Sequence, residues 1–387
     1  MPSVSYRRMF RSISRGGLRY IFGKRGERRV QGWRLLYRLR IAALLLTDEP
    51  LLKITQRTEV RLWVDGAEAF SRLEKLLARA RHTIFIQMFI WKDDAVGKRI
   101  AAILIDAADR GVQVDINKEA VGDFFEITGD FLTTQHLKDP VWKRLWHHPR
   151  IRITHTTNND HAKVFVIDDQ ILLLTGMNIA EEYRERWHDY LIELRGTRFV
   201  QQYLTENEDK RREEDPVHLL MNSGHVKQIR PAVMDLLSSA LSSILLEQCY
   251  LSDPAVIDLL IAQSKKGIRI TIIVPERQDL HFHANMQAMR RLLTEGSVRF
   301  IQVFLYPGIV HGKVILIDRT RMLLGSANLI TSSLDDMGEV CVVIEGRYRI
   351  ALMKLRDVLR GDILKSKLLA TLPRFGWVDR WLAWLGL

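Results

Sequence analysis

Two octapeptides of one pattern, HAKVFVID and HGKVILID, start 150 residues apart. Each begins with a histidine and a lysine two residues apart, continues as an apolar stretch and ends in an aspartate. Because alternate side chains of a strand share one face of the sheet, the histidine and lysine of each copy are predicted to point the same way. The aspartates are followed by polar residues and are predicted to lie in turns. These residues are His161, Lys163 and Asp168 in the first copy and His311, Lys313 and Asp318 in the second.

Further polar residues follow the two copies at equal distances. Asn178 and Asn328 each come ten residues after the aspartate of their copy, and Asp189 and Glu339 each come 28 residues after the histidine. The second copy adds Ser326, two residues before its asparagine. One His-x-Lys-x4-Asp match is weak evidence, but a paired match with equal offsets predicts a functional site that is built twice.

This combination of residue types suits covalent transfer at a phosphodiester. One histidine can attack phosphorus to give a phosphohistidine, while the other protonates the leaving alkoxide and later deprotonates the acceptor. A carboxylate behind each histidine would fix its tautomer and stabilise the imidazolium. Two lysines and two asparagines supply hydrogen-bond donors for the non-bridging phosphate oxygens.

The predicted chemistry needs neither a metal ion nor another cofactor. The lysines provide the positive charge, and the sequence shows no acidic cluster of the kind that holds Mg²⁺. Asp279, His281 and His283 are the alternative metal ligands, but only three candidates lie in this short stretch. A position at a pocket rim or a helix start is therefore favoured for them over a zinc site.

A longer internal repeat must position the two motifs. Residues 82–116 and 242–274 each read as a strand, a polar break, an amphipathic helix and a second strand. Each helix ends at a basic residue followed by glycine, at Gly111 and Gly267. The predicted fold is α/β, with two pseudo-symmetric halves, each a mixed, mostly parallel sheet flanked by helices, and an active site at their interface.

The chain is predicted to have five parts. Cys249 and Cys341 each lie in an apolar, strand-like run and are interpreted as buried hydrophobic residues, which fits a reducing compartment. The parts are a basic N-terminal segment (1–58), a first half (59–204), a charged connection (205–216), a second half (217–365) and a tryptophan-rich segment (366–387).

The net charge of +12 is concentrated at the N-terminus. Residues 1–40 hold twelve basic residues and one acidic residue, so the rest of the chain carries a net charge of +1. This segment favours contact with an anionic membrane surface. An organelle transit peptide and a solvated tail are the alternatives. No apolar stretch reaches the roughly 18 residues of a spanning helix and no signal peptide is visible, so the chain is predicted to lie on a membrane rather than to cross it.

The C-terminal segment offers a second membrane contact. Trp377, Trp381 and Trp384 are spaced to share one face of a helix. Tryptophan favours the headgroup region of a bilayer, where its ring is buried and its N–H stays hydrated. A helix docked on the protein core is the alternative.

The motifs resemble the duplicated His-x-Lys-x4-Asp element of the phospholipase D superfamily. The segment GMNIAEEY and the downstream Trp187-x-Asp189 resemble the bacterial cardiolipin synthases of that superfamily. The resemblance covers about residues 59–365. It implies that His161 is the nucleophile and His311 the acid/base.

The resemblance also implies supporting roles and a reaction. Asp189 and Glu339 would orient the histidines, and Asp168 and Asp318 would brace the motifs rather than react. The implied enzyme is peripheral at the cytoplasmic face of the bacterial inner membrane, with a mitochondrial location as the alternative. It would transfer a phosphatidyl group from one phosphatidylglycerol to another and release glycerol.

Two other activities remain open at this point. A phospholipase D-type hydrolase would use water as the acceptor, and a nuclease would cleave a nucleic acid phosphodiester. A nuclease is expected to carry its positive charge around the cleft, whereas this chain carries it in the N-terminal segment. Nucleic acid is therefore not the expected partner.

Overall fold

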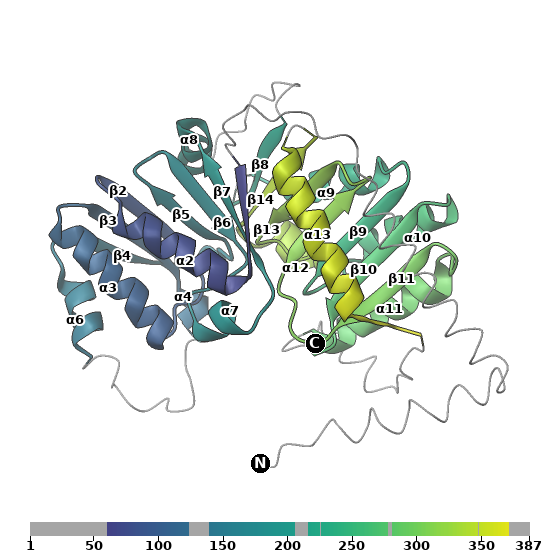
Figure 1. Ribbon diagram of the computed structural model, residues 1–387, viewed down its shortest axis with the longest axis horizontal. Helices are drawn as coiled ribbons and strands as arrows, with labels where there is room; N and C mark the ends of the chain where they lie inside the picture. The colour runs from purple at the N-terminus through teal and green to yellow at the C-terminus, as the bar shows by residue number, and fades with distance from the viewer. Residues whose placement is uncertain are drawn as a thin grey trace, which may run out of the picture. The chain divides into compact units, whose positions relative to one another are not determined.

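The computed structural model describes residues 60–123, 139–205, 216–224, 226–277, 281–346 and 348–370. By internal contacts the chain divides into residues 1–53 and residues 54–387, and every described residue belongs to the second unit. The elements of the first half (Figure 1) are β1 (Val60–Val64), α2 (Asp65–Ala78), β2 (Thr83–Met88), α3 (Ala95–Asp109), β3 (Gln113–Glu119), α4 (Ala120–Asp123), α6 (Pro140–His147), β4 (Ile151–Thr156), β5 (Lys163–Ile167), β6 (Ile171–Thr175), α7 (Glu181–Glu185), β7 (Tyr190–Arg195) and α8 (Thr197–Thr205).

The second half repeats this order of strands and helices. Helices α9, α10 and α11 of this half follow the pattern of α2, α3 and α6, with strands between them (Figure 1). Its elements are β8 (Val217–Asn222), α9 (Ile229–Ser238), β9 (Ser243–Gln248), α10 (Pro254–Lys265), β10 (Arg269–Pro275), α11 (Phe282–Glu295), β11 (Ile301–Tyr306), β12 (Lys313–Ile317), β13 (Arg321–Gly325), α12 (Thr331–Asp335), β14 (Glu339–Glu345), α13 (Arg349–Lys365) and β15 (Lys367–Leu368).

Each half builds one mixed sheet. The strand orders are β1-β7-β6-β5-β2-β3-β4 and β15-β11-β10-β9-β12-β13-β14-β8. The predicted α/β fold with two similar halves and mixed sheets is confirmed. The expectation of mostly parallel sheets is corrected, because antiparallel pairs outnumber parallel ones among the described strands of both sheets. Only the helix-connected strands are parallel, whereas the short turns after β5 and β12 force an antiparallel return.

The predicted helix signals form as expected. Asp94 caps α3 by accepting a hydrogen bond from the Gly97 amide at 2.8 Å, and Asp253 caps α10 in the same way. Gly111 and Gly267 follow the two helices with φ of 102° and 92°, a conformation that glycine adopts without a steric penalty. The equivalent caps fix where the chain leaves each helix and returns to the sheet as the next parallel strand.

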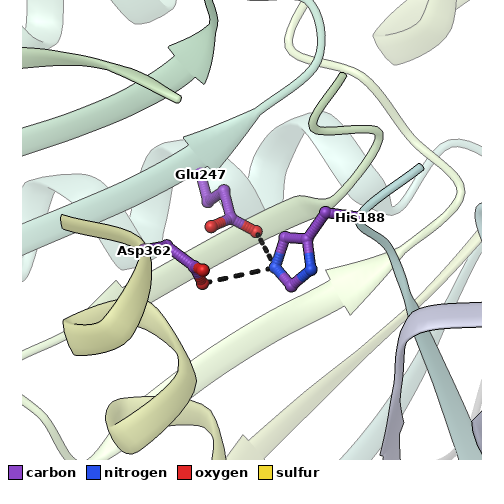
Figure 2. A group of neighbouring side chains, drawn as sticks. All are labelled: His188, Glu247 and Asp362. Atoms are coloured by element: carbon purple, nitrogen blue, oxygen red, sulfur yellow. Dashed lines mark ion pairs between the residues drawn. The ribbon is translucent and has the colours of Figure 1, made fainter. Parts of the chain in front are cut away.

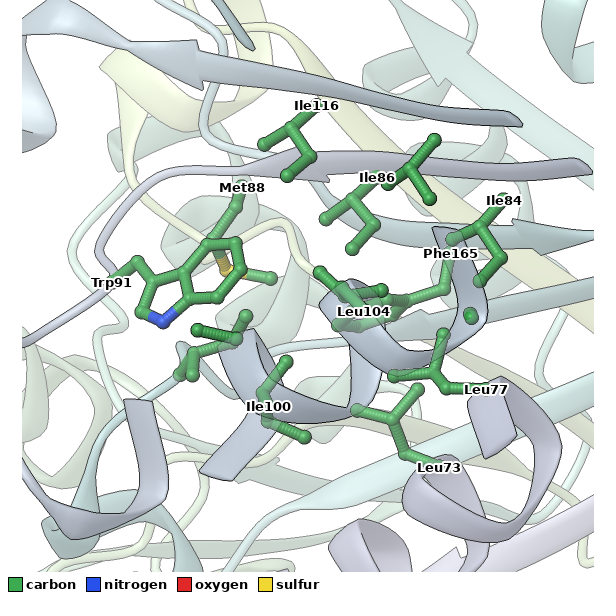
Figure 3. Packing of buried hydrophobic residues seen from close by; sticks show 14 of the residues in the cluster. Leu73, Leu77, Ile84, Ile86, Met88, Trp91, Ile100, Leu104, Ile116 and Phe165 are labelled. Atoms are coloured by element: carbon green, nitrogen blue, oxygen red, sulfur yellow. The ribbon is translucent and has the colours of Figure 1, made fainter. Parts of the chain in front are cut away.

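Apolar side chains from α2, α3 and the central strands form the core of the first half (Figure 3). Leu77, Ile86, Ile100, Leu104 and Ile116 are fully buried in this cluster. Burying one such side chain stabilises the folded state by roughly 1.5–3 kcal/mol. The strands that position the site are therefore held in place by a well-packed core. Both cysteines are buried and neither forms a disulfide bond, as predicted. Among the described residues, no helix has the length and apolar character needed to span a membrane.

Candidate active site

The two histidine–lysine motifs occupy equivalent positions in the two sheets. Lys163 is the first residue of β5 and Lys313 the first residue of β12, and each histidine lies two positions before the first residue of its strand. Both strands lie beside the first parallel strand of their half, β2 or β9. Both lysine side chains are buried, as is His311, whereas 16% of the His161 side chain remains exposed.

Each histidine is held by a carboxylate from the opposite half. His161 Nδ1 lies 3.0 Å from Glu339 Oε1, and His311 Nδ1 lies 2.7 Å from Asp189 Oδ2. Backbone hydrogen bonds also connect the two halves. The His161 amide donates to the Gly338 carbonyl and the His311 amide to the His188 carbonyl, both at 2.7 Å. The two motifs therefore share one site, and neither half can hold its histidine alone.

The two carboxylates have different electrostatic surroundings. Burial by itself would raise the pKa of Glu339, but the charge and hydrogen bond of His161, with the charge of Lys163, lower it to about 2. Burial raises the pKa of Asp189 to about 6, against the opposing charge of Lys313. Glu339 is therefore ionised throughout the neutral range, which suits a partner for a histidine that becomes positively charged.

Burial and neighbouring charge also change the proton affinity of the first motif. Burial lowers the pKa of Lys163 to about 7, and burial together with the charge of Lys163 lowers the pKa of His161. The Lys163 ammonium donates to the His161 carbonyl, and the Lys313 ammonium donates to the His311 carbonyl at 2.5 Å. A histidine with a lowered pKa is neutral at pH 7 and has a lone pair available.

Two serines complete the surroundings of Glu339. The hydroxyl of Ser326 donates to Oε2 and accepts from the Val340 amide, and the hydroxyl of Ser333 donates to Oε1 at 2.5 Å. Ser326 was identified from the sequence, whereas Ser333 was missed. The signal for Ser333 was weak, because a serine in a short helix (α12) has no distinctive spacing to the motif.

The first half has no equivalent hydroxyl at its carboxylate. A Cβ at Gly176, the counterpart of Ser326 by the 150-residue offset, would lie 2.6 Å from Asp189 Oδ2. Thr175 instead donates to the Tyr190 carbonyl at 2.7 Å and accepts from the Met177 amide. The duplicated site is therefore asymmetric where the carboxylates are held.

The two asparagines have structural contacts. Asn178 Oδ1 accepts from the Ile90 amide at 3.0 Å, and its Nδ2 donates to the Tyr183 hydroxyl at 2.7 Å. The backbone N–H of Asn328 donates to Ser333 Oγ at 2.9 Å. Within the described residues, the side-chain oxygen of Asn328 is buried without a hydrogen-bond partner, so it is the asparagine oxygen left for a ligand.

Asp168 and Asp318 lie at the far ends of the motif strands. Each aspartate comes five positions after its lysine, about 17 Å along the chain at the usual strand rise. Asp168 accepts from the amides of residues 81–83, and Asp318 from those of residues 241–243. Both are held in turns with positive φ, as their sequence context predicted. Their position fits bracing of the motif and not contact with a substrate.

Aromatic rings line both histidines, and sequence reasoning missed most of them. The ring of Phe89 makes an edge contact with His161 at a centroid distance of 4.9 Å. Tyr183 and Trp187 lie 5.2 and 5.3 Å from the His311 ring. Tyr183 and Trp187 lie in the segments that resemble the cardiolipin synthases, but no contact with a histidine was predicted for either, and Phe89 had no sequence signal. The rings restrict the imidazoles to orientations in which Nδ1 meets its carboxylate.

Some predicted features lie outside the described residues. These are the basic segment 1–58, Asp279, and Trp377, Trp381 and Trp384. His281 is described and lies directly before α11, a helix-start position as predicted, with a left-handed φ of 56°. Its ring lies 4.7 Å from that of Tyr250.

A duplicated α/β fold with paired His-x-Lys motifs at one shared site defines a phospholipase D-like protein. The family model described as "Cardiolipin synthase, PLD-like domain" matches residues 73–210 and 233–357. The chain therefore belongs to this phospholipase D-like family and is an enzyme of the phospholipase D superfamily.

Individual relatives agree with this assignment. The chain is 25% identical to cardiolipin synthase B of Escherichia coli (strain K12) over 338 residues, which cover 79% of this chain and 80% of that protein. It is 25% identical to the cardiolipin synthase of Geobacillus sp. (strain WCH70) over 327 residues, or 73% of this chain and 64% of that protein.

Solved structures support the fold. The crystal structure of phosphatidylserine synthase from Haemophilus influenzae Rd KW20 superposes with a TM-score of 0.66, covering 90% of this chain and 96% of that chain at 15% identity. Polyphosphate kinase from Porphyromonas gingivalis gives a TM-score of 0.54 at 16% identity, covering 88% of this chain and 57% of that chain. At these identities the likeness concerns the fold alone.

Proposed function

We propose that this chain is a phosphatidyltransferase of the cardiolipin synthase type, which transfers a phosphatidyl group between two phosphatidylglycerol molecules. The observation that carries the proposal is the crossed pairing of His161 with Glu339 and of His311 with Asp189. This pairing commits both Nδ1 atoms to carboxylates, so the chemistry of both rings falls to Nε2. The lipid substrate is inferred from the family and from the names of the curated relatives.

In the first step, Nε2 of His161 attacks the donor phosphorus and the bond from phosphorus to the glycerol headgroup oxygen breaks. His311 donates a proton to that oxygen, and free glycerol leaves. Two features support His161 as the nucleophile. Its lowered pKa keeps it neutral, and ionised Glu339 stabilises the positive charge that the ring gains on bonding to phosphorus.

In the second step, the terminal hydroxyl of a second phosphatidylglycerol gives its proton to His311. Its oxygen attacks phosphorus, the phosphorus–nitrogen bond breaks, and cardiolipin leaves. Lys163 and Lys313 bind the non-bridging oxygens and stabilise the charge that develops on them. Water in place of the acceptor hydroxyl would give phosphatidate.

The test is the product mixture that the purified full chain forms on phosphatidylglycerol vesicles, resolved by mass spectrometry. We expect cardiolipin and glycerol from the wild type, and a loss of roughly 10³-fold or more in His161→Ala. His147→Ala is the matched control, because His147 is an exposed residue at the end of α6 whose ring contacts the Lys143 carbonyl of the same helix.

Each other outcome contradicts the proposal in a defined way. Phosphatidate without cardiolipin would assign hydrolysis instead of transfer. An unaltered rate in His161→Ala would remove His161 from the chemistry. No turnover of any phospholipid would reject a lipid substrate, and nucleic acid phosphodiesters would then be the substrates to examine.

A further inference from the structure

His188, the neighbour of Asp189, lies in a buried cluster of acidic residues that the proposed reaction does not use. Its Nδ1 lies 2.5 Å from Asp65 Oδ1. Its Nε2 lies 3.5 Å from Glu247 Oε1 and 3.3 Å from Asp362 Oδ2, the two contacts that Figure 2 marks. His188, Glu247 and Asp362 are all at least 94% buried. These three ligand-type atoms lie within 4.8 Å of one another.

The cluster joins three separate parts of the fold. His188 precedes β7 of the first half, Glu247 lies on β9 of the second half, and Asp362 lies in the last turn of α13. Residues this far apart in the sequence gave no motif, which explains why sequence analysis did not identify them.

The distances fit ligands around a metal ion better than hydrogen bonds. Good N–H···O bonds are about 2.7–3.2 Å long, and an N–H shared between two oxygens makes a longer and weaker bond to each. Ligand atoms bound tetrahedrally to zinc at about 2.0–2.2 Å are about 3.4 Å apart. The two separations from His188 Nε2 match that tetrahedral edge.

The contact with Asp65 orients the His188 ring in the way expected of a metal ligand. Metal-bound histidines usually donate their other N–H to a carboxylate, which fixes the tautomer and leaves the opposite nitrogen as the ligand. With its Nδ1 proton directed at Asp65, His188 presents Nε2 to Glu247 and Asp362. The Tyr190 hydroxyl lies 3.0 Å from the same nitrogen and donates to Glu247 Oε1 at 2.7 Å.

The charges of the cluster call for a cation. Asp65, Glu247 and Asp362 carry up to three negative charges, and Lys365, 3.4 Å from Asp362 Oδ1, offsets one of them. Burial by itself would lower the pKa of His188, but these carboxylates raise it, so without an ion the imidazolium would offset a second charge. Glu247 Oε2 and Asp362 Oδ2 are buried without a hydrogen-bond partner among the described residues. A proton on His188 Nε2 would be shared between the Tyr190 hydroxyl at 3.0 Å and Asp362 Oδ2 at 3.3 Å, and Glu247 Oε2 would still lack a donor, which is costly in a buried site.

The second motif is adapted to this cluster. A Cβ at Gly312, between His311 and Lys313, would lie 2.8 Å from Glu247 Oε1 and 2.8 Å from the Tyr190 ring. The first motif has Ala162 at the same place. Glycine is therefore needed in the second motif because Glu247 and Tyr190 fill the space behind it.

We propose that His188, Glu247 and Asp362 form a structural site for a divalent transition-metal ion, with zinc as the best-fitting ion. Histidine nitrogen with two carboxylate oxygens is a ligand set that zinc accepts, and the Tyr190 oxygen or a water would be the fourth ligand. The ion would fasten the first half to the second half and to α13 behind His311. It takes no part in the phosphoryl chemistry.

The test is the metal content of the full chain, purified without chelators or a metal-affinity column and measured by inductively coupled plasma mass spectrometry. We expect about one zinc per chain. His188→Asn, Glu247→Gln and Asp362→Asn should each lose it, whereas His148→Asn should retain it. His148 is the matched control, because it lies 3.2 Å from the Asp109 carboxylate at the surface.

Two further measurements do not depend on whether a variant folds. Wild-type chain stripped with a chelator should gain a higher Tm on adding Zn²⁺, and the gain should saturate at one equivalent. Co²⁺ added in place of Zn²⁺ should give the visible absorption of a tetrahedral site.

Asp65→Asn should weaken zinc binding by roughly 10- to 100-fold.

The proposal is overturned if stripped wild-type chain binds neither ion, or binds them without a change in Tm. It is also overturned if folded variants of the three ligands keep the full metal content. The first result would assign the cluster to a protonated His188 shared between carboxylates, and the second would place the metal elsewhere.

Discussion

Lys163 is a buried cation whose charge changes near neutral pH. Its side chain is fully buried, and its ammonium lies 5.1 Å from the Phe89 ring centroid. Burial is the largest influence on its pKa and lowers it to about 7, so the lysine is charged below about pH 7 and neutral above it. A positive charge at this position is what the proposed reaction needs to bind a phosphate.

We therefore predict that kcat/KM, which reports the free enzyme, falls as pH rises through about 7. A bound phosphate favours the ammonium form, so the fall in kcat should occur at higher pH. Lys163→Arg should be less active but should lose this decline, because a guanidinium keeps its proton throughout the range. Initial rates from pH 5.5 to 9 on vesicles of constant composition measure both. A flat wild-type profile, or the same decline in the arginine variant, would contradict the prediction.

At the scale of elements, the motif strands are anchored at both ends. The histidine end is held by the opposite half, and the aspartate end is held by backbone amides of its own half. Backbone hydrogen bonds from Leu241, Ser242 and Ser243 outweigh burial and lower the pKa of Asp318. An aspartate at this end stabilises the turn and the start of the neighbouring strand, and has no route to the reacting atoms.

Asp168→Asn and Asp318→Asn should each lower the free energy of unfolding by about 1–3 kcal/mol. Asparagine tolerates the positive φ at both positions, so the change isolates the loss of the carboxylate. Urea unfolding curves measure the effect, and Asp169→Asn, an exposed neighbour in the same turn with φ of 51°, is the control. We expect kcat per folded molecule to change less than about tenfold. A collapse of kcat with unaltered stability would instead place the aspartates in the chemistry.

At the scale of the whole molecule, the positive charge and the candidate active site belong to different parts of the chain. Residues 1–40 carry eleven of the twelve net positive charges, and the site lies in the unit of residues 54–387. Each basic residue near an anionic bilayer contributes about 1 kcal/mol of attraction, which salt screens. We therefore propose that the N-terminal segment attaches the enzyme to the membrane that holds its substrate.

Replacing four basic residues of this segment by glutamine should weaken binding to phosphatidylglycerol vesicles at least tenfold at low salt. Binding of the wild type should fall as salt rises, and vesicles of zwitterionic lipid should bind it weakly. Sedimentation with sucrose-loaded vesicles measures all three. If glutamine in place of four exposed basic residues outside the segment weakened vesicle binding equally, the attraction would not be specific to the N-terminal segment. The test residues are Arg7, Arg8, Arg11 and Arg15, and the body controls are Lys75, Arg79, Lys265 and Lys266.

The sequence by itself determined every feature that depends on local pattern. Short apolar runs set the motif strands, the turns formed at the two aspartates, and the glycines ended the repeated helices. The duplication also identified the residues that meet at the site, because equal offsets from the motif pick out Asp189 and Glu339 without knowledge of the fold. Local periodicity encodes these features, so they can be predicted from a single chain.

Only the tertiary structure decided which groups meet across the halves. Equal spacing in each half cannot say that His161 takes its carboxylate from the second half and His311 from the first. The direction of most strand pairs and the His188 cluster depend in the same way on which edges and ends are brought together. The histidine–carboxylate contacts of the site and of the cluster join residues separated by more than 50 positions, and they are fixed by the packing of two complete halves. No local pattern in the sequence carries that information.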